Sequence, residues 1–164
     1  MDKVARHANE LIGQMDNRTS KLEMVWKQRA GGGRATARRY LDFAVDNHSL
    51  FEMISGDLIG RLGWGANENN RESVEVLLLE KPPDLQNGRC LLYVCPECGD
   101  IGCGALTVKI EKTREHFVWK EFGYENNYYD RMPLLEEYKH IGPFFFDKDQ
   151  YFQALSDYLK SVKD

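Results

Sequence analysis

The sequence lacks any long hydrophobic run. None of its apolar stretches approaches the roughly 18 consecutive residues that a membrane-spanning helix needs. The first residues, MDKVARHANELIGQMDNR, also lack the apolar centre of a secretory signal. We therefore expect a cytoplasmic protein with no membrane partner, in a compartment where cysteine thiols stay reduced.

Catalytic motifs are missing as well. The four histidines stand in no spacing that would join a serine or cysteine to a base. The glycines at 31–33 and in the loop at 56–65 are not followed by the lysine and Ser/Thr of a phosphate-binding loop. Neighbouring acids such as Glu136 and Glu137 are typical of surface charge. The sequence thus predicts a protein that is not an enzyme.

Charge is distributed unevenly along the chain. The formal net charge is −4. Residues 1–40 contain nine basic and four acidic residues, a balance of +5, which leaves −9 for the remainder. The acidic charge of the chain after residue 40 argues against nucleic acid as the partner. It suits a basic protein partner, because complementary fields speed association. Solubility alone is the alternative explanation.

Two segments are expected from the pattern of the first half. Apolar residues recur at helical spacing over 2–16, which predicts an amphipathic helix. The sequence AGGGR at 30–34 then breaks regular structure. We therefore assign residues 1–37 to a basic N-terminal helical segment. Residues 38–164 are assigned to one α+β domain that carries a cysteine knuckle at 95–104.

The domain is predicted to be an antiparallel sheet of about four or five strands with helices packed on it. A strand with one buried face is expected at 39–46, because apolar and polar residues alternate there. Ser49 and Glu52 form a capping box that predicts a short helix. Further strands are predicted at 90–95, 105–111, 116–124 and 144–147, and further helices at 70–80 and after Asp147.

Three of the four cysteines fall within a glycine-rich turn, CPECGDIGCG at 95–104. Cys95 and Cys98 have the C-x2-C spacing that lets two thiolates reach one zinc ion at about 2.3 Å. Cys103 follows after glycines that could fold its sulfur back toward the other two. The sequence therefore predicts a candidate structural zinc site at this turn.

The fourth ligand of a tetrahedral site is predicted to be His116, on a neighbouring strand. Cys90 is disfavoured, because a strand over 90–95 would place it on the opposite face, about 16 Å from Cys95. Two other interpretations stay open. The cysteines could simply pack beneath a tight turn that glycines permit. They could also serve a redox or nucleophilic role, although no basic residue lies within four positions of Cys98 to activate it.

A segment rich in acids and tyrosines spans residues 121–138. Tyrosine is enriched at the energetic centres of interfaces, and carboxylates beside it could meet a basic partner. The alternative is a solvated loop whose tyrosines cover the sheet edge. The candidate partner-binding residues are Glu121, Tyr124, Glu125, Tyr128, Tyr129, Asp130, Glu136 and Glu137.

Several motifs together resemble a family of small bacterial proteins. They are a D-x-x-S-L turn after a strand, the C-x-x-C-G-D-x-G-C-G knuckle, a V-W strand and a final G-P-F-x-F-D, and they cover residues 38–160. Proteins of this kind resemble immunity proteins of contact-dependent growth inhibition and related toxin–immunity systems. The resemblance implies a cytoplasmic protein that binds the C-terminal domain of a cognate toxin, often a nuclease.

Three functions follow as expectations. The first is an immunity protein that binds and neutralises a toxin domain without catalysis. The second is a thiol-based redox protein or enzyme that uses the cluster from Cys95 to Cys103. The third is an adaptor whose fold is stabilised by zinc.

Overall fold

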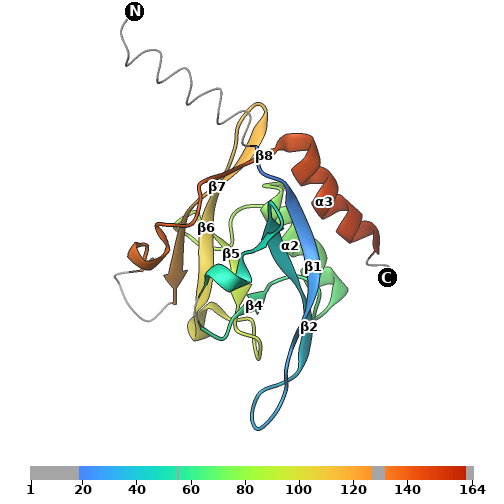
Figure 1. Cartoon of the computed structure of the whole chain (residues 1–164), viewed down its shortest axis with the longest axis vertical. Helices are drawn as coiled ribbons and strands as arrows, with labels where there is room; N and C mark the ends of the chain where they lie inside the picture. Colours follow the sequence, from blue (N-terminus) through green and yellow to red (C-terminus); the bar gives the residue numbers. More distant parts are fainter. Residues whose placement is uncertain (1–18, 55, 127–131, 162–164) are drawn as a thin grey trace, which may run out of the picture.

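A five-stranded antiparallel sheet forms the centre of the computed structural model, which describes residues 19–54, 56–126 and 132–161 (Figure 1). Its strands lie in the order β4-β5-β6-β7-β8. Their bounds are Ile59–Gly60, Cys90–Val94, Ala105–Lys112, His116–Glu125 and Phe144–Asp147. The predicted meander is confirmed as β5, β6 and β7, and the predicted α+β class with one antiparallel sheet of this size is confirmed with it.

A second antiparallel sheet, absent from the sequence-based prediction, contains β1 (Leu22–Arg29), β2 (Arg38–Val45) and β3 (His48–Ser49). β1 and β2 pair without interruption along their whole length. The glycines at 31–33 form the hairpin loop between them, where Gly33 has a φ of +57° that suits glycine. The predicted boundary between residues 37 and 38 is therefore wrong, because it cuts this hairpin. Part of the segment predicted to be helical, residues 22–29, forms a strand instead. The helix predicted over 2–16 lies outside the described residues.

β2 is buried on both faces, whereas the sequence predicts one buried face. Asp42, on the face expected to be polar, has no exposed surface. Its carboxylate accepts hydrogen bonds from the hydroxyl of Tyr93 at 2.6 Å and from the hydroxyl of Ser49. The ammonium group of Lys27 lies 3.2 Å from it. The carboxylate can be buried because these partners replace the water it loses.

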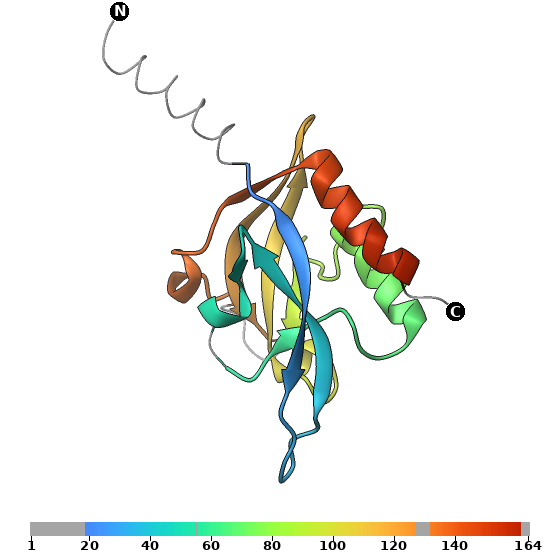
Figure 2. The ribbon, with the colours of Figure 1, turned by 45° about the vertical axis from the view of Figure 1, so that its right-hand side comes forward.

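Two helices, α2 (Asn67–Leu77) and α3 (Lys148–Ser161), lie side by side (Figure 2). α2 confirms the helix predicted at 70–80, although it begins three residues earlier than expected. α3 confirms the helix predicted after Asp147. The carboxylate of Asp147 caps α3 by accepting a hydrogen bond from the backbone N–H of Gln150 at 3.0 Å. The described residues also contain three short 3-10 turns, η1 (Phe51–Met53), η2 (Ile101–Cys103) and η3 (Glu136–Tyr138).

Trp119 of β7 joins both sheets to the helices. Its fully buried ring stands edge-on to Phe43 of β2 and to Phe146 of β8, with centroid distances of 5.5 and 5.0 Å. Its indole N–H donates to the hydroxyl of Tyr151 on α3 at 3.1 Å. That hydroxyl in turn donates to the carbonyl of Leu77 on α2 at 2.6 Å. Edge-to-face ring pairs add about 0.5–1.5 kcal/mol each beyond burial, so this cluster fixes the frame that carries the surface sites.

Candidate functional site

Three cysteine sulfurs converge in the turn between β5 and β6. The Sγ atoms of Cys95, Cys98 and Cys103 all lie within 4.8 Å of one another. The sulfurs of Cys98 and Cys103 are 3.2 Å apart. Cys95 is half-buried, and the other two are exposed. The predicted convergence of the three thiols is thus present, and the group is close enough to hold one metal ion.

Glycine and aspartate shape this turn. Gly99, with a φ of +73°, donates its N–H to the carbonyl of Cys95 at 2.9 Å and so closes the first bend. Asp100 then caps η2, because its carboxylate accepts the N–H of Gly102 at 3.2 Å. Gly104, with a φ of +97°, returns the chain to β6. These conformations bring Cys103 back over the C-x2-C pair.

Hydrogen bonds within the knuckle shift the pKa values of two thiols in opposite directions. Burial opposes ionisation of Cys95, but the backbone N–H groups of Cys98 and Glu97 donate to its sulfur, so the pKa of Cys95 is lowered overall. The pKa of Cys103 is raised to about 12, because its thiol is hydrogen-bonded to Cys98 and Cys95. Cys95 is therefore the more acidic of these two thiols, and Cys103 keeps its proton near neutral pH. A metal ion bound at the cluster would displace the proton of Cys103.

The donor set suits a soft divalent ion. Three thiolates favour zinc over calcium or magnesium. His116 is not the fourth ligand, because it lies at the opposite end of β7, where it pairs with Asp147. The knuckle end of β7 is Glu125, which pairs with Ala105. The two ends are nine residue steps apart along the strand, roughly 30 Å. Among the described residues, no further His, Cys, Asp or Glu side chain joins the three cysteines.

The fourth cysteine has a different environment. Cys90 is fully buried in the core at the start of β5. Burial raises the pKa of its thiol to about 11. Cys90 therefore packs as a small apolar residue in the core. It is not part of the cysteine cluster, in agreement with the expectation that disfavours it as a ligand.

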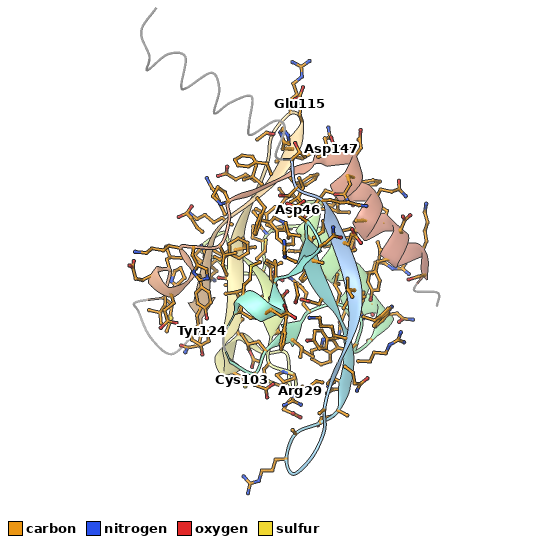
Figure 3. All side chains as sticks on the ribbon, in the orientation of Figure 1. Arg29, Asp46, Cys103, Glu115, Tyr124 and Asp147 are labelled. Atoms are coloured by element: carbon orange, nitrogen blue, oxygen red, sulfur yellow. The ribbon has the colours of Figure 1, made fainter. Side chains whose placement is uncertain are left out.

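The knuckle is fastened to the β1–β2 hairpin. The carboxylate of Glu97 accepts hydrogen bonds from the hydroxyl and the N–H of Thr36. Arg29 binds the same carboxylate, and the guanidinium of Arg38 donates to the carbonyl of Pro96 at 2.8 Å. Figure 3 shows the labelled Arg29 and Cys103 at the same end of the molecule. Local sequence signals could not reveal these contacts, since the partners lie about 60 positions apart in the chain.

Glu125, predicted to face a partner, lies in the interior instead. It is only 5% exposed. Its carboxylate accepts hydrogen bonds from Arg89 at 3.0 Å, Asn87 at 2.7 Å and Thr107 at 2.5 Å. A bulge in β7 at Glu121, which has a φ of +54°, adds one residue opposite β6, so that Glu125 lies on the face of Thr107, opposite to that of Trp119. The buried guanidinium of Arg89 covers that face, so Glu125 is shielded from solvent.

The other residues predicted to bind a partner fall into separate groups. Glu121, on the bulge, is exposed, as are Glu136 and Glu137 in η3. Tyr124 is half-buried and packs against Gly104, so it supports the knuckle (Figure 3). The remaining three, Tyr128, Tyr129 and Asp130, lie outside the described residues.

A hollow of about 540 Å³ opens beside β7, β8 and η3. Charged side chains, including Glu121, stand at its rim. Leu134 and Leu135, which precede η3, are 43% and 37% exposed. A cluster of exposed leucines next to an apolar hollow is typical of a binding surface. The lining is mainly apolar and includes Val118, Phe122, Leu135, Tyr138, Ile141, Pro143 and Phe145.

Comparison with protein-family models, with curated proteins and with solved structures gives no match. No helix in the described part of the chain has the length and apolar character needed to cross a bilayer. The cysteine knuckle and the hollow beside η3 are therefore the candidate functional sites.

Proposed function

We propose that this protein binds a partner protein at the hollow beside β7, β8 and η3, without catalysing a reaction. The observation that carries the proposal is the apolar hollow, whose lining includes the exposed Leu135. An apolar side chain of the partner would fill it. Buried apolar anchors supply most of the binding energy in protein interfaces, commonly about 2 kcal/mol or more each.

The charged side chains around the hollow are mostly paired, and Glu137 leaves a small acidic excess that suits a basic partner. Glu121 pairs with Lys109 at 3.6 Å, and Lys139 pairs with Glu136. All four side chains are exposed, and exposed ion pairs contribute only about 0–1 kcal/mol. A basic side chain of the partner could therefore replace these lysines at little cost. Glu137 is exposed and makes no ion pair within the described residues.

The partner class that we propose is a basic toxin domain, which makes the protein an immunity protein. The acidic balance of the chain after residue 40 and its resemblance to immunity proteins support this choice. The carboxylates near η3 would take the places that nucleic-acid phosphates occupy in the cationic groove of a nuclease. Binding there would exclude the substrate.

The test measures binding to the toxin domain encoded beside the gene for this protein. We expect tight binding by calorimetry. Leu135→Asp should weaken it by at least about thirtyfold, the equivalent of one lost anchor. Met53→Asp is the matched control, because Met53 is equally exposed at 37% but lies in η1. The absence of binding, or equal losses in both variants, would contradict the proposal.

We also propose that the cysteine knuckle holds one structural zinc ion, as in the adaptor expected from the sequence. The three convergent sulfurs support this role. Elemental analysis of untagged protein should find one equivalent of zinc, and its absence would contradict the site. The thiol-redox function uses the same sulfurs, and reduction of insulin disulfides by the metal-free protein would favour it instead.

A further inference from the structure

The outer edge of β1 offers unpaired backbone groups. β1 is the end strand of its sheet, and no described strand pairs with its other side. The carbonyl of Lys21 points toward β2, where it accepts the N–H of Asp46. Backbone direction alternates along an antiparallel strand. The N–H and C=O groups of Leu22, Met24 and Trp26 therefore point away from β2.

Gln150 of α3 already occupies the first position on this edge. Its side-chain NH2 donates to the carbonyl of Leu22 at 2.7 Å, and its side-chain oxygen accepts the N–H of Leu22 at 3.0 Å. The two bonds are those that a neighbouring strand would make. The next outward groups, on Met24 and Trp26, have no hydrogen-bond partner within the described residues. Such a row of donors and acceptors is a template for an added strand.

A groove of about 560 Å³ runs beside this edge. Met24 and Trp26 of β1 line one side, and Ala154 and Tyr158 of α3 line the other. In Figures 1 and 2, α3 runs beside β1. Trp26 is 45% exposed there. Side chains of an added strand would have apolar surface to pack on.

The charge of the groove is negative. Asp157 of α3 lines it and makes no ion pair within the described residues, although Gln153 donates a hydrogen bond to it at 2.6 Å. Lys21 and Glu23 line the groove as well, but they neutralise each other at 3.6 Å. A Lys or Arg side chain on the occupant would complement Asp157.

We propose that the groove between β1 and α3 binds an extended peptide segment of a partner protein, which adds to β1 as a fourth strand. Apolar residues at alternate positions of the segment face the groove, because side chains alternate along a strand. A Lys or Arg among them meets Asp157. The occupant is a segment of a partner rather than the same edge of a second copy, because the β1 edge of a second copy is itself flanked by α3.

The test begins with a phage-displayed library of random nonapeptides, selected on the full-length protein. We expect enrichment of peptides with alternating apolar residues and at least one Lys or Arg. Hydrogen exchange then locates the binding. A bound peptide should slow exchange at the amides of Met24 and Trp26, whereas Val25 and Lys27, which face β2, should be protected with or without peptide.

Variants separate the edge from the rest of the surface. Met24→Pro removes an outward N–H, which an edge strand tolerates, and should weaken peptide binding by about tenfold or more while the melting temperature shows a folded protein. Asp157→Asn should weaken binding of the basic peptides selectively. Phe152→Ala is the control, because Phe152 is an exposed residue of α3 outside the groove lining.

Three outcomes would overturn the inference. They are the failure to enrich any peptide, bound peptides that leave exchange at Met24 and Trp26 unchanged, and concentration-dependent protection of these amides in the free protein, which would assign the edge to a second copy. The inference does not depend on the hollow beside η3. Leu135→Asp should leave peptide binding unchanged, so failure of one site is distinguishable from failure of the other.

Discussion

The carboxylate of Glu97, between two cysteines of the knuckle, lies 2.9 Å from the guanidinium of Arg29 at the end of β1. Thr36, in the loop that follows β1, donates two further hydrogen bonds to the same carboxylate at 2.6 and 3.0 Å. The position of the C-x2-C pair therefore depends on a hairpin from the first part of the chain.

This relationship predicts a pH dependence in the metal-free protein. The pKa of Glu97 is lowered from 4.5 to about 2, mainly by the hydrogen bonds from Thr36 and also by Arg29. The stabilisation from a lowered carboxyl pKa is complete above the unfolded value and is lost as pH falls through the folded value. The contact should thus weaken between about pH 4.5 and pH 2. Carboxyl NMR should give a midpoint near 2, and Thr36→Val should raise it. An ordinary midpoint in the unaltered protein would contradict the contact.

Gly104 is predicted to tolerate no side chain. Its φ is +97°, and an added Cβ would collide with the ring of Tyr124. Gly88 is the matched control, because its φ is +87° but its surroundings are open. In urea unfolding, Gly104→Ala should cost about 1–3 kcal/mol more than Gly88→Ala. Tyr124→Ala in the same chain should remove most of the difference. Equal losses for the two glycines would show that the close contact has no effect.

The buried ion pair between Arg89 and Glu125 predicts a large loss of stability when one partner is removed. Arg89 is 2% exposed, and burial lowers its pKa while Glu125 opposes that shift. Glu125→Ala should cost about 3–5 kcal/mol, because it leaves a buried charge without its partner. Glu111→Ala breaks an exposed pair with Lys120 and should cost less than about 1 kcal/mol. Denaturant unfolding at neutral pH gives both values. Similar losses would mean that water reaches Arg89.

Zinc binding should depend on the knuckle and not on the other predicted ligand. Cys98→Ser and Cys103→Ser should each weaken it on the order of 100-fold or more. His116→Ala should leave it unchanged, because His116 lies at the far end of β7. Competition with a chromophoric chelator measures these affinities. A loss in His116→Ala as large as that in Cys98→Ser would restore the ligand set predicted from the sequence.

Periodic patterns were enough to predict most of the regular elements. Alternation along 105–111 and 116–124 marks β6 and β7, and the cap at Asp147 marks α3. The sequence predicts no strand at β1, because the apolar Val25 interrupts the alternation of Leu22, Met24 and Trp26 with polar residues. Asp42 can be buried on the second face of β2 because Tyr93 donates a hydrogen bond to its carboxylate. Tyr93 lies 51 positions away in the chain, and no local pattern encodes such a partner.

The candidate sites were predictable only where spacing determines geometry. C-x2-C followed by a glycine-rich turn predicts the meeting of Cys95, Cys98 and Cys103. The exclusion of His116 requires the register of β6 and β7, which the sequence leaves open. The burial of Glu125 depends on Arg89, which lies 36 positions away in the chain, and no local pattern encodes such a partner. The hollow beside η3 combines residues from β6, β7, β8 and η3, so it can be recognised only in the fold.

The amide clamp of Gln150 on Leu22 has a consequence for synthesis on the ribosome. The two residues are 128 positions apart, so the β1–β2 hairpin emerges long before its clamp is translated. Throughout that interval the nascent chain exposes a strand edge with unpaired N–H and C=O groups, which is prone to pair with other chains. A translation product that stops before Gln150 would carry this hazard for its whole lifetime.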